Sequence, residues 1–228
     1  GGQPRSGLAQ LDLLSAQATA WQISASYPRA LGAEFWALAI SGDTLFVAGQ
    51  YQAIAGSPGA NASAVSITTA ERFTWTPRTN DYVFALALQG REVYLGGWYT
   101  SLGEWVERRG LAAIDARTGR VTDWNPRPDD YVKSILAWDG KIYVGGYFSS
   151  VGSQPRSGIA ALDAVSGLAT DWNPGANGAV WAIQHWRDRL LVGGLFTSTL
   201  ATLLVLPAMY SWFDRRQTQS SLCAEASE

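Results

Sequence analysis

Short apolar runs separated by glycine-rich and polar turns follow one another along most of the chain. The stretch 157–196 contains four such runs, each too short for a helix and bounded by turn-forming residues. These runs are 159–163, 168–172, 180–186 and 190–196. The polar link Arg187-Asp188-Arg189 between the last two runs is typical of a β-hairpin. The pattern therefore predicts four short strands in this stretch.

The same pattern recurs upstream at a fixed period of about 48 residues. Glycine pairs mark the period at Gly96-Gly97, Gly145-Gly146 and Gly193-Gly194, and Ala48-Gly49 stands at this position in the first copy. A period of this size indicates a solenoid, a propeller or an array, because each unit has apolar faces that only a neighbour can cover. Four strands per repeat are typical of a propeller blade.

The expected fold is all-β: a β-propeller of four four-stranded blades, either closed or forming an arc of a larger ring, with a short C-terminal apolar helix. The repeats are expected to form one domain over 1–198. Its four copies are predicted at 2–51, 52–99, 100–148 and 149–196.

Two phrases carry a resemblance to a known repeat. SGIAALDAVSGLATDWNPGANGAVWAI and YVGGYFSSVGSQPRSGIAALD resemble the bacterial delta-60 type β-propeller repeat, a family of undefined function in secreted and cell-surface proteins. The resemblance covers 2–198 and weakens in the second copy, where Trp75-Thr76-Pro77 replaces Trp-Asn-Pro. It implies a propeller fold and an extracellular or cell-surface location, and it brings no enzymatic motif.

Composition agrees with a compact β protein and excludes some functions. The 228 residues are 47% hydrophobic and 16% charged, with 24 glycines and 11 tryptophans. The net charge of -2 gives no basic surface for nucleic acid, so no nucleic-acid partner is expected. A single cysteine, Cys223, excludes an intrachain disulfide or a thiolate metal site. Calcium loops, phosphate loops and H-E-x-x-H are missing from the sequence, so no cofactor or metal is expected.

Two sets of residues invite a catalytic interpretation. The only histidine, His185, aligns with Ala137 and Leu88 in sister copies, so the fold does not require it, and the sequence offers no triad around it. Asp115 and Asp163 recur in phase, as do two further aspartates before Trp-Asn-Pro, and could act as general acids or bases.

Each recurrent aspartate stands beside a predicted turn, where its carboxylate would bind the local backbone. The aspartates before Trp-Asn-Pro are Asp123 and Asp171. The turn role is favoured, and no catalytic residue is predicted. The recurrent Trp75, Trp124 and Trp172 could stack on carbohydrate, but their phase favours packing between blades.

The loops that differ between copies are better candidates for binding. Before the third run of their repeats, two copies place an aspartate next to a tyrosine: Asp81-Tyr82 and Asp130-Tyr131. By blade equivalence both tyrosines should lie on one face, where they would contact a sugar or a peptide. The alternative, that each tyrosine covers its neighbour's edge, stays open. Elsewhere, the sequon Asn61-Ala62-Ser63 suggests a surface loop.

The C-terminal part of the chain follows a different pattern. Residues 190–213 carry no charge and are long enough to span a membrane. The stretch 192–216 resembles the last membrane helix of heavy-metal RND efflux pumps. Because the repeat and the pump phrase overlap at 190–198, a chimera formed by recombination or by sequence assembly is an alternative to a natural chain.

The strand is favoured over the helix at this overlap. That leaves an apolar helix at 199–213, which would anchor the chain in a membrane if it spans one, and a disordered tail at 214–228. A spanning helix would keep Arg215 and Arg216 in the cytoplasm and the propeller outside. At the other end, 1–7 match 152–158 and no initiator methionine is present, which predicts a fragment.

The predicted function is a non-enzymatic binding or surface-display module with an unknown protein or carbohydrate ligand, an interpretation that rests partly on fold analogy. Two alternatives remain: a fragment of a membrane efflux transporter, which only the tail supports, and a carbohydrate-active propeller enzyme. The enzyme would need two carboxylates that converge on one face of the ring.

Overall fold

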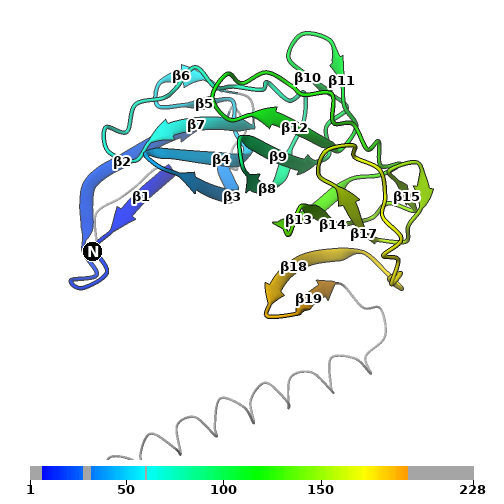
Figure 1. Cartoon of the computed structure of the whole chain (residues 1–228). Coiled ribbons are helices and arrows are strands. Elements are labelled where there is room, and N and C mark those ends of the chain that lie inside the picture. The colour runs from blue at the N-terminus through cyan, green and yellow to red at the C-terminus, as the bar shows by residue number, and fades with distance from the viewer. Residues whose placement is uncertain (1–6, 28–31, 60, 195–228) are drawn as a thin grey trace, which may run out of the picture. The chain divides into compact units, whose positions relative to one another are not determined.

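A computed structural model describes residues 7–27, 32–59 and 61–194 (Figure 1). All described residues belong to one compact unit of the chain, Gly1–Gly194. The predicted helix at 199–213 and the tail at 214–228 lie outside the described residues. In the part that is described, every regular element is a β-strand, as the short apolar runs bounded by turns predicted.

The strands are short, and their order repeats along the chain. Their bounds are β1 (Gly7–Leu11), β2 (Ala18–Ser26), β3 (Glu34–Ser41), β4 (Thr44–Gln50), β5 (Ala53–Ile54), β6 (Ser57–Pro58), β7 (Ala62–Ser66), β8 (Val83–Gln89), β9 (Glu92–Gly97), β10 (Ser101–Leu102), β11 (Val106–Glu107), β12 (Leu111–Asp115), β13 (Val132–Trp138), β14 (Lys141–Gly146), β15 (Ser150–Val151), β16 (Gln154–Pro155), β17 (Ile159–Asp163), β18 (Val180–Trp186) and β19 (Arg189–Gly194).

Three sheets share one antiparallel order: β3-β4-β7, β8-β9-β12 and β13-β14-β17. Each sheet joins a hairpin from one repeat to a third strand from the next repeat. The hairpin strands β3, β8, β13 and β18 lie next to one another in sequence order, and we call them the inner strands (Figure 1). The last hairpin, β18-β19, has no third strand among the described residues.

The fourth strand predicted for each blade is wrong for these sheets. In place of a strand at 168–172, the chain makes one isolated bridge, Leu162 to Ala169, and the sister copies make the same single bridge. The reason lies in Trp-Asn-Pro, because proline donates no backbone hydrogen bond and ends the pairing within a few residues. The sheets therefore have three strands and one bridged residue.

The hairpins that begin with the inner strands lie close to where the sequence predicts them. The run 180–186 is β18, and Arg189 belongs to β19 rather than to the loop, so the connection is the two residues Arg187-Asp188. In the equivalent loop before β14, Asp139 and Gly140 both have positive φ, at 50° and 69°. Two such residues are the requirement of a type I′ hairpin turn.

The second position of each glycine pair approaches a backbone carbonyl too closely for a side chain. A Cβ at Gly97 would lie 2.1 Å from the oxygen of Tyr82, and one at Gly146 would lie 2.3 Å from that of Tyr131. Gly49 and Gly194 repeat this contact. The close approach explains why the glycine recurs with the period. Opposite the pair, each inner strand carries an extra residue, a β-bulge.

The first copy departs from the common plan. Its β1 and β2 pair over most of their lengths. The end of β2 pairs with β5, and β5 pairs with β6, which makes a four-stranded sheet. By repeat equivalence β1 matches the third strands, β7, β12 and β17. The edge of β1 opposite β2 has no partner strand within the described part of the chain.

The core lies between neighbouring sheets. Trp75 and Trp124 are 3% and 4% exposed, which confirms their predicted packing role. Each indole Nε1 donates a hydrogen bond to a carbonyl of the next repeat: Trp75 to Asp115 at 3.0 Å, and Trp124 to Asp163 at 3.1 Å. Trp172 stands at the same position after the last third strand, yet it is 37% exposed.

Candidate functional site

The four bulges present one residue each at the same end of the inner strands. These bulged residues are Trp36, Phe84, Lys133 and Trp181. Because they occupy equivalent positions on adjacent strands, their side chains gather in one region. A bulge re-aims a side chain relative to the regular pleat, and bulges are frequent next to binding sites.

Aromatic rings link these positions into one surface. The Trp36 and Phe84 rings lie 5.1 Å apart, and Phe84 lies 6.1 Å from Tyr131. Tyr131 stacks on Trp98 at 5.1 Å and lies 4.4 Å from Tyr147. We call the whole group the aromatic surface: Trp36, Tyr82, Phe84, Trp98, Tyr131, Lys133, Tyr147 and Trp181.

Lys133 is the cation within the aromatic surface. Its Nζ lies 3.2 Å from the centre of the Phe84 ring and 5.1 Å from that of Trp181, both within the range of a cation–π interaction. Burial lowers the pKa of this ammonium group from its usual value. Lys133 therefore contacts rings from the repeats on both sides of its own.

Several rings of the aromatic surface keep an accessible face. Trp98 is 57% exposed, Trp181 43%, Tyr147 40% and Trp36 38%. Single exposed apolar residues are ordinary on a protein surface, but a continuous group of large rings marks an interaction site.

The predicted residues Tyr82 and Tyr131 both lie on the aromatic surface, where each contacts Phe84. Burial, and then the hydrogen bond with Tyr147, raise the pKa of Tyr131 to about 12. The predicted carboxylates hold the backbone: Asp81 Oδ1 accepts from the Tyr82 N–H at 2.8 Å, and Asp130 Oδ1 accepts from the Tyr131 N–H at 2.7 Å.

Each Asp-Tyr pair also lines a hollow next to the aromatic surface. Asp81 and Tyr82 border one of about 350 Å³, and Asp130, Tyr131 and Trp98 border one of about 120 Å³. The structure thus brings the four predicted site residues to equivalent places in two repeats.

Sequence reasoning missed the bulged residues and the rings after the glycine pairs. A signal was present, because each bulged residue directly follows an in-phase apolar residue, as Trp36 follows Phe35 and Trp181 follows Val180. Their chemistry varies, so a search for identical residues passes over them.

The sequon prediction of a surface loop is wrong. Asn61 is only 9% exposed, and its Nδ2 donates hydrogen bonds to the carbonyls of Thr79 and Asp81. Its φ of 60° is the conformation that Gly110 and Gly158 adopt at the same position, and asparagine tolerates it better than most residues. The side chain therefore holds the Asp81 loop in place.

Asp115 and Asp163 are turn residues, as predicted. Asp163 Oδ1 accepts hydrogen bonds from the Ser166 N–H and Oγ, both at 2.7 Å, and these bonds lower its pKa. Asp115 accepts the same pair from Thr118, with the same effect on its pKa. Asp123 and Asp171 lie exposed.

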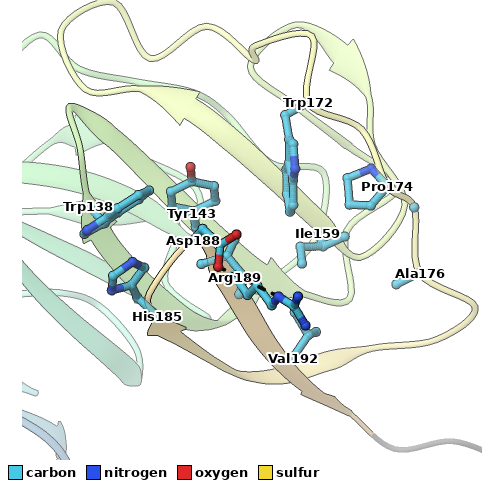
Figure 2. A pocket seen from close by; sticks show the side chains of 12 residues that line it. Trp138, Tyr143, Ile159, Trp172, Pro174, Ala176, His185, Asp188, Arg189 and Val192 are labelled. Atoms are coloured by element: carbon cyan, nitrogen blue, oxygen red, sulfur yellow. Dashed lines mark ion pairs between the residues drawn. The ribbon is translucent and has the colours of Figure 1, made fainter.

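His185 stacks on Trp138, with ring centres 4.1 Å apart, on the wall of a hollow beside β19 (Figure 2). No group of three or more His, Cys, Asp or Glu side chains among residues 7–27, 32–59 and 61–194 is arranged to hold a metal. The same residues include no helix long and apolar enough to cross a membrane.

Comparisons with known proteins concern the fold. Among solved structures, the computationally designed Ika4 protein is 14% identical, with a TM-score of 0.49 over 70% of this chain and 84% of that one. The RRP9 WD40 repeats are 11% identical, with a TM-score of 0.46 over 76% of this chain and 46% of that one. Sqt1 of Saccharomyces cerevisiae is 11% identical, with a TM-score of 0.37 over 82% and 63%.

No curated protein matches the sequence. This chain spans less than half of the RRP9 structure. Residues 139–166 match the family model described as "Domain of unknown function (DUF5122) beta-propeller". The match spans β14 and β17 and confirms, for these residues, the resemblance to a propeller repeat of undefined function. The described part of the chain is all-β and contains a β-propeller repeat segment.

Proposed function

We propose that the chain is a non-enzymatic binding module and that the aromatic surface is its ligand site. The observation that carries this proposal is the continuity of large rings across four repeats, which the contact of Tyr147 with Trp181 at 6.2 Å completes. Ring faces stay accessible on Trp36, Trp98, Tyr147 and Trp181. The scaffold repeats while these side chains vary, as expected where a rigid fold presents a specific surface.

The ligand class we favour is carbohydrate. Tryptophan and tyrosine rings offer rigid apolar faces with polar edges, which suit the C–H face of a sugar ring. The carboxylates of Asp81 and Asp130 border hollows next to these rings and can accept hydrogen bonds from hydroxyl groups. A peptide is the other candidate, and the binding screen below separates the two.

A binding role rather than hydrolysis is supported by the carboxylates. A glycosidase needs a carboxylic acid whose pKa is raised so that it can donate a proton. The described carboxylates with a resolved change shift in the opposite direction, because hydrogen bonds stabilise their charged form. They are Asp12, Asp43, Asp115, Asp129 and Asp163. Burial raises the pKa of Asp129, and the hydrogen bonds from Ser149 and Ser150 together outweigh this effect. The proposed place of action is outside the cell or on its surface, which the repeat resemblance implies.

The test is a glycan and peptide array, followed by titration of tryptophan fluorescence with the best glycan. Trp98→Ala and Trp181→Ala should each weaken binding by about tenfold, since each removes a stacking face worth about 1–2 kcal/mol. Trp105→Ala is the matched control, because Trp105 is 92% exposed and lies outside the aromatic surface. Equal affinities for all three variants, or binding of peptides alone, would refute the carbohydrate proposal.

A further inference from the structure

The last hairpin exposes positions that are buried in every other sheet. Leu191 of β19 is 56% exposed, whereas its equivalents Phe46, Tyr94 and Tyr143 are at most 7% exposed. Val192 is 45% exposed. The difference arises because β19 has no third strand beside it in the described structure. An apolar edge of this kind is a template for pairing with another strand.

A hollow of about 380 Å³ opens where that third strand would lie (Figure 2). Tyr143 and Trp172 form one wall, with ring centres 5.4 Å apart and nearly perpendicular planes. The equivalent pair in the preceding sheets, Tyr94 and Trp124, has the same geometry at 5.0 Å but is covered by Leu162 and Ala164 of the next repeat.

Strand β1 and the turn after it are the complementary part. The phrase Gly7-Leu8-Ala9-Gln10-Leu11-Asp12 matches Gly158 to Asp163, and residues 195–228 contain no further copy of it. Leu11 is 62% exposed and Leu13 is 98% exposed. Their equivalents in the last complete repeat, Leu162 and Ala164, are 0% and 9% exposed. Leu11 and Leu13 thus have the position and the chemistry to fill the hollow beside Trp172.

The inner face next to β1 lacks its cover as well. Leu38 and Ile40 of β3 are 54% and 62% exposed. Their equivalents in β8, Leu86 and Leu88, pack against the core cluster formed with the preceding sheet. A hairpin equivalent to β18-β19, placed before β3, would cover these two side chains in the same way.

We propose that a second copy of the chain supplies the missing strands, so that β1 of one copy pairs with β19 of the other. Repeat equivalence fixes the antiparallel pairing. Because Lys141 faces Asp163 and Tyr143 faces Ala161 in the complete sheet, Arg189 faces Asp12 of the second copy and Leu191 faces its Gln10. Each joint then makes one complete sheet with a third strand, as elsewhere in the fold.

A second copy, rather than the chain's own β1, is the occupant because β1 and β19 each keep an unpaired edge among residues 7–27, 32–59 and 61–194. The main contacts between inner strands run from β3 to β8, β8 to β13 and β13 to β18, and they do not include β18 to β3. In a dimer, β1 of each copy pairs with β19 of the other, so both unpaired strand edges are covered at once. This is the closed symmetric arrangement that oligomers favour.

The joint also extends the aromatic surface from one copy to the other, since Trp181 of β18 would come beside the position of Trp36. The association itself does not depend on the proposed carbohydrate ligand. It is measured without any glycan, so its failure and a failure of the ligand proposal are distinguishable.

The first test is sedimentation of the full chain without ligand, where a dimer is expected. Leu11→Asp and Leu191→Asp should each weaken dimerisation by about tenfold or more, because each places a charge in a buried joint. Val165→Asp is the control, since Val165 is 89% exposed in a complete repeat. Circular dichroism checks that each variant folds. A monomeric wild type, or a dimer that both aspartate variants leave intact, overturns the proposal.

The second test is a crosslink between two differently marked chains in a Cys223→Ser background. Gln10→Cys in one chain and Leu191→Cys in the other should form a disulfide-linked dimer on mixing and oxidation, because directly paired antiparallel residues lie within disulfide reach. Trp105→Cys in place of Gln10→Cys should not crosslink. Failure to crosslink overturns the proposal, and so does a chain carrying both cysteines that closes only on itself.

Discussion

At the scale of single residues, the recurrent aspartates make stability depend on pH. Hydrogen bonds from Ser166 lower the folded-state pKa of Asp163 below its unfolded value. Its stabilising effect is therefore present above the unfolded pKa and is lost as the pH falls through the folded pKa. Asp163→Asn keeps an acceptor oxygen without the charge. Urea unfolding from about pH 5 to about pH 2 should show a smaller loss of stability in this variant than in the wild type.

Asp171→Asn serves as the control for this measurement, because Asp171 is exposed and stands just before Trp172 rather than inside the turn. Its acid dependence should match that of the wild type. If Asp163→Asn also matches the wild type, the turn carboxylate does not contribute to stability as its hydrogen bonds indicate.

The sequence correctly predicted the turn role of Asp115 and Asp163, but it wrongly predicted an exposed loop at Asn61. Recurrence revealed the aspartates, because Asp115 and Asp163 stand at one position of the period beside a turn glycine. The role of Asn61 depends on its φ of 60° and on carbonyls 18 and 20 residues away. A three-residue sequon contains neither the backbone conformation nor the distant partners.

At the scale of strands, the second glycine of each pair determines how closely the inner hairpin can pair. Gly146→Ala should destabilise the fold by about 2 kcal/mol or more, since the new Cβ would lie 2.3 Å from the Tyr131 carbonyl oxygen and the backbone would have to move. Thermal unfolding measures the effect.

Gly193→Ala is the matched control for this substitution, and both variants are melted at high dilution, where no second copy is paired with β19. The new Cβ would meet only the Ala182 Cβ, at 3.8 Å, which is an ordinary contact. Its melting temperature should stay close to that of the wild type. Equal destabilisation by both substitutions would mean that general loss of glycine flexibility, rather than the carbonyl contact, decides the result.

The short apolar runs predicted the hairpin strands and the third strands but not the bulges. A β-bulge depends on how two strands pair, so the sequence of one apolar run does not reveal whether it contains an extra residue. The bulge between Val132 and Ser134 is what brings Lys133 to the aromatic surface. Tyr82 and Tyr131 could be predicted because they directly precede β8 and β13 and so lie outside the bulges.

At the scale of the whole repeat array, each sheet is stabilised by its neighbours, so stability should fall toward the ends. Hydrogen exchange of the dilute chain should be slowest in β9 and β14, whose sheets have a sheet on either side, and fastest in β1 and β19. Raising the protein concentration should slow exchange in β1 and β19 specifically if a second copy pairs with them. Uniform protection at low concentration would contradict this gradient.

The boundaries of the sequence repeats do not coincide with those of the sheets, and this affects how such a chain can change its length in evolution. Because each three-stranded sheet unites a hairpin from one repeat with a third strand from the next, inserting or deleting one whole period leaves β1 and the hairpin β18-β19 unaltered. The gene can therefore gain or lose copies by unequal crossing-over without a new kind of junction between repeats, and each resulting protein keeps the same first and last strands. Selection can then act on the number of copies while the joining chemistry stays constant.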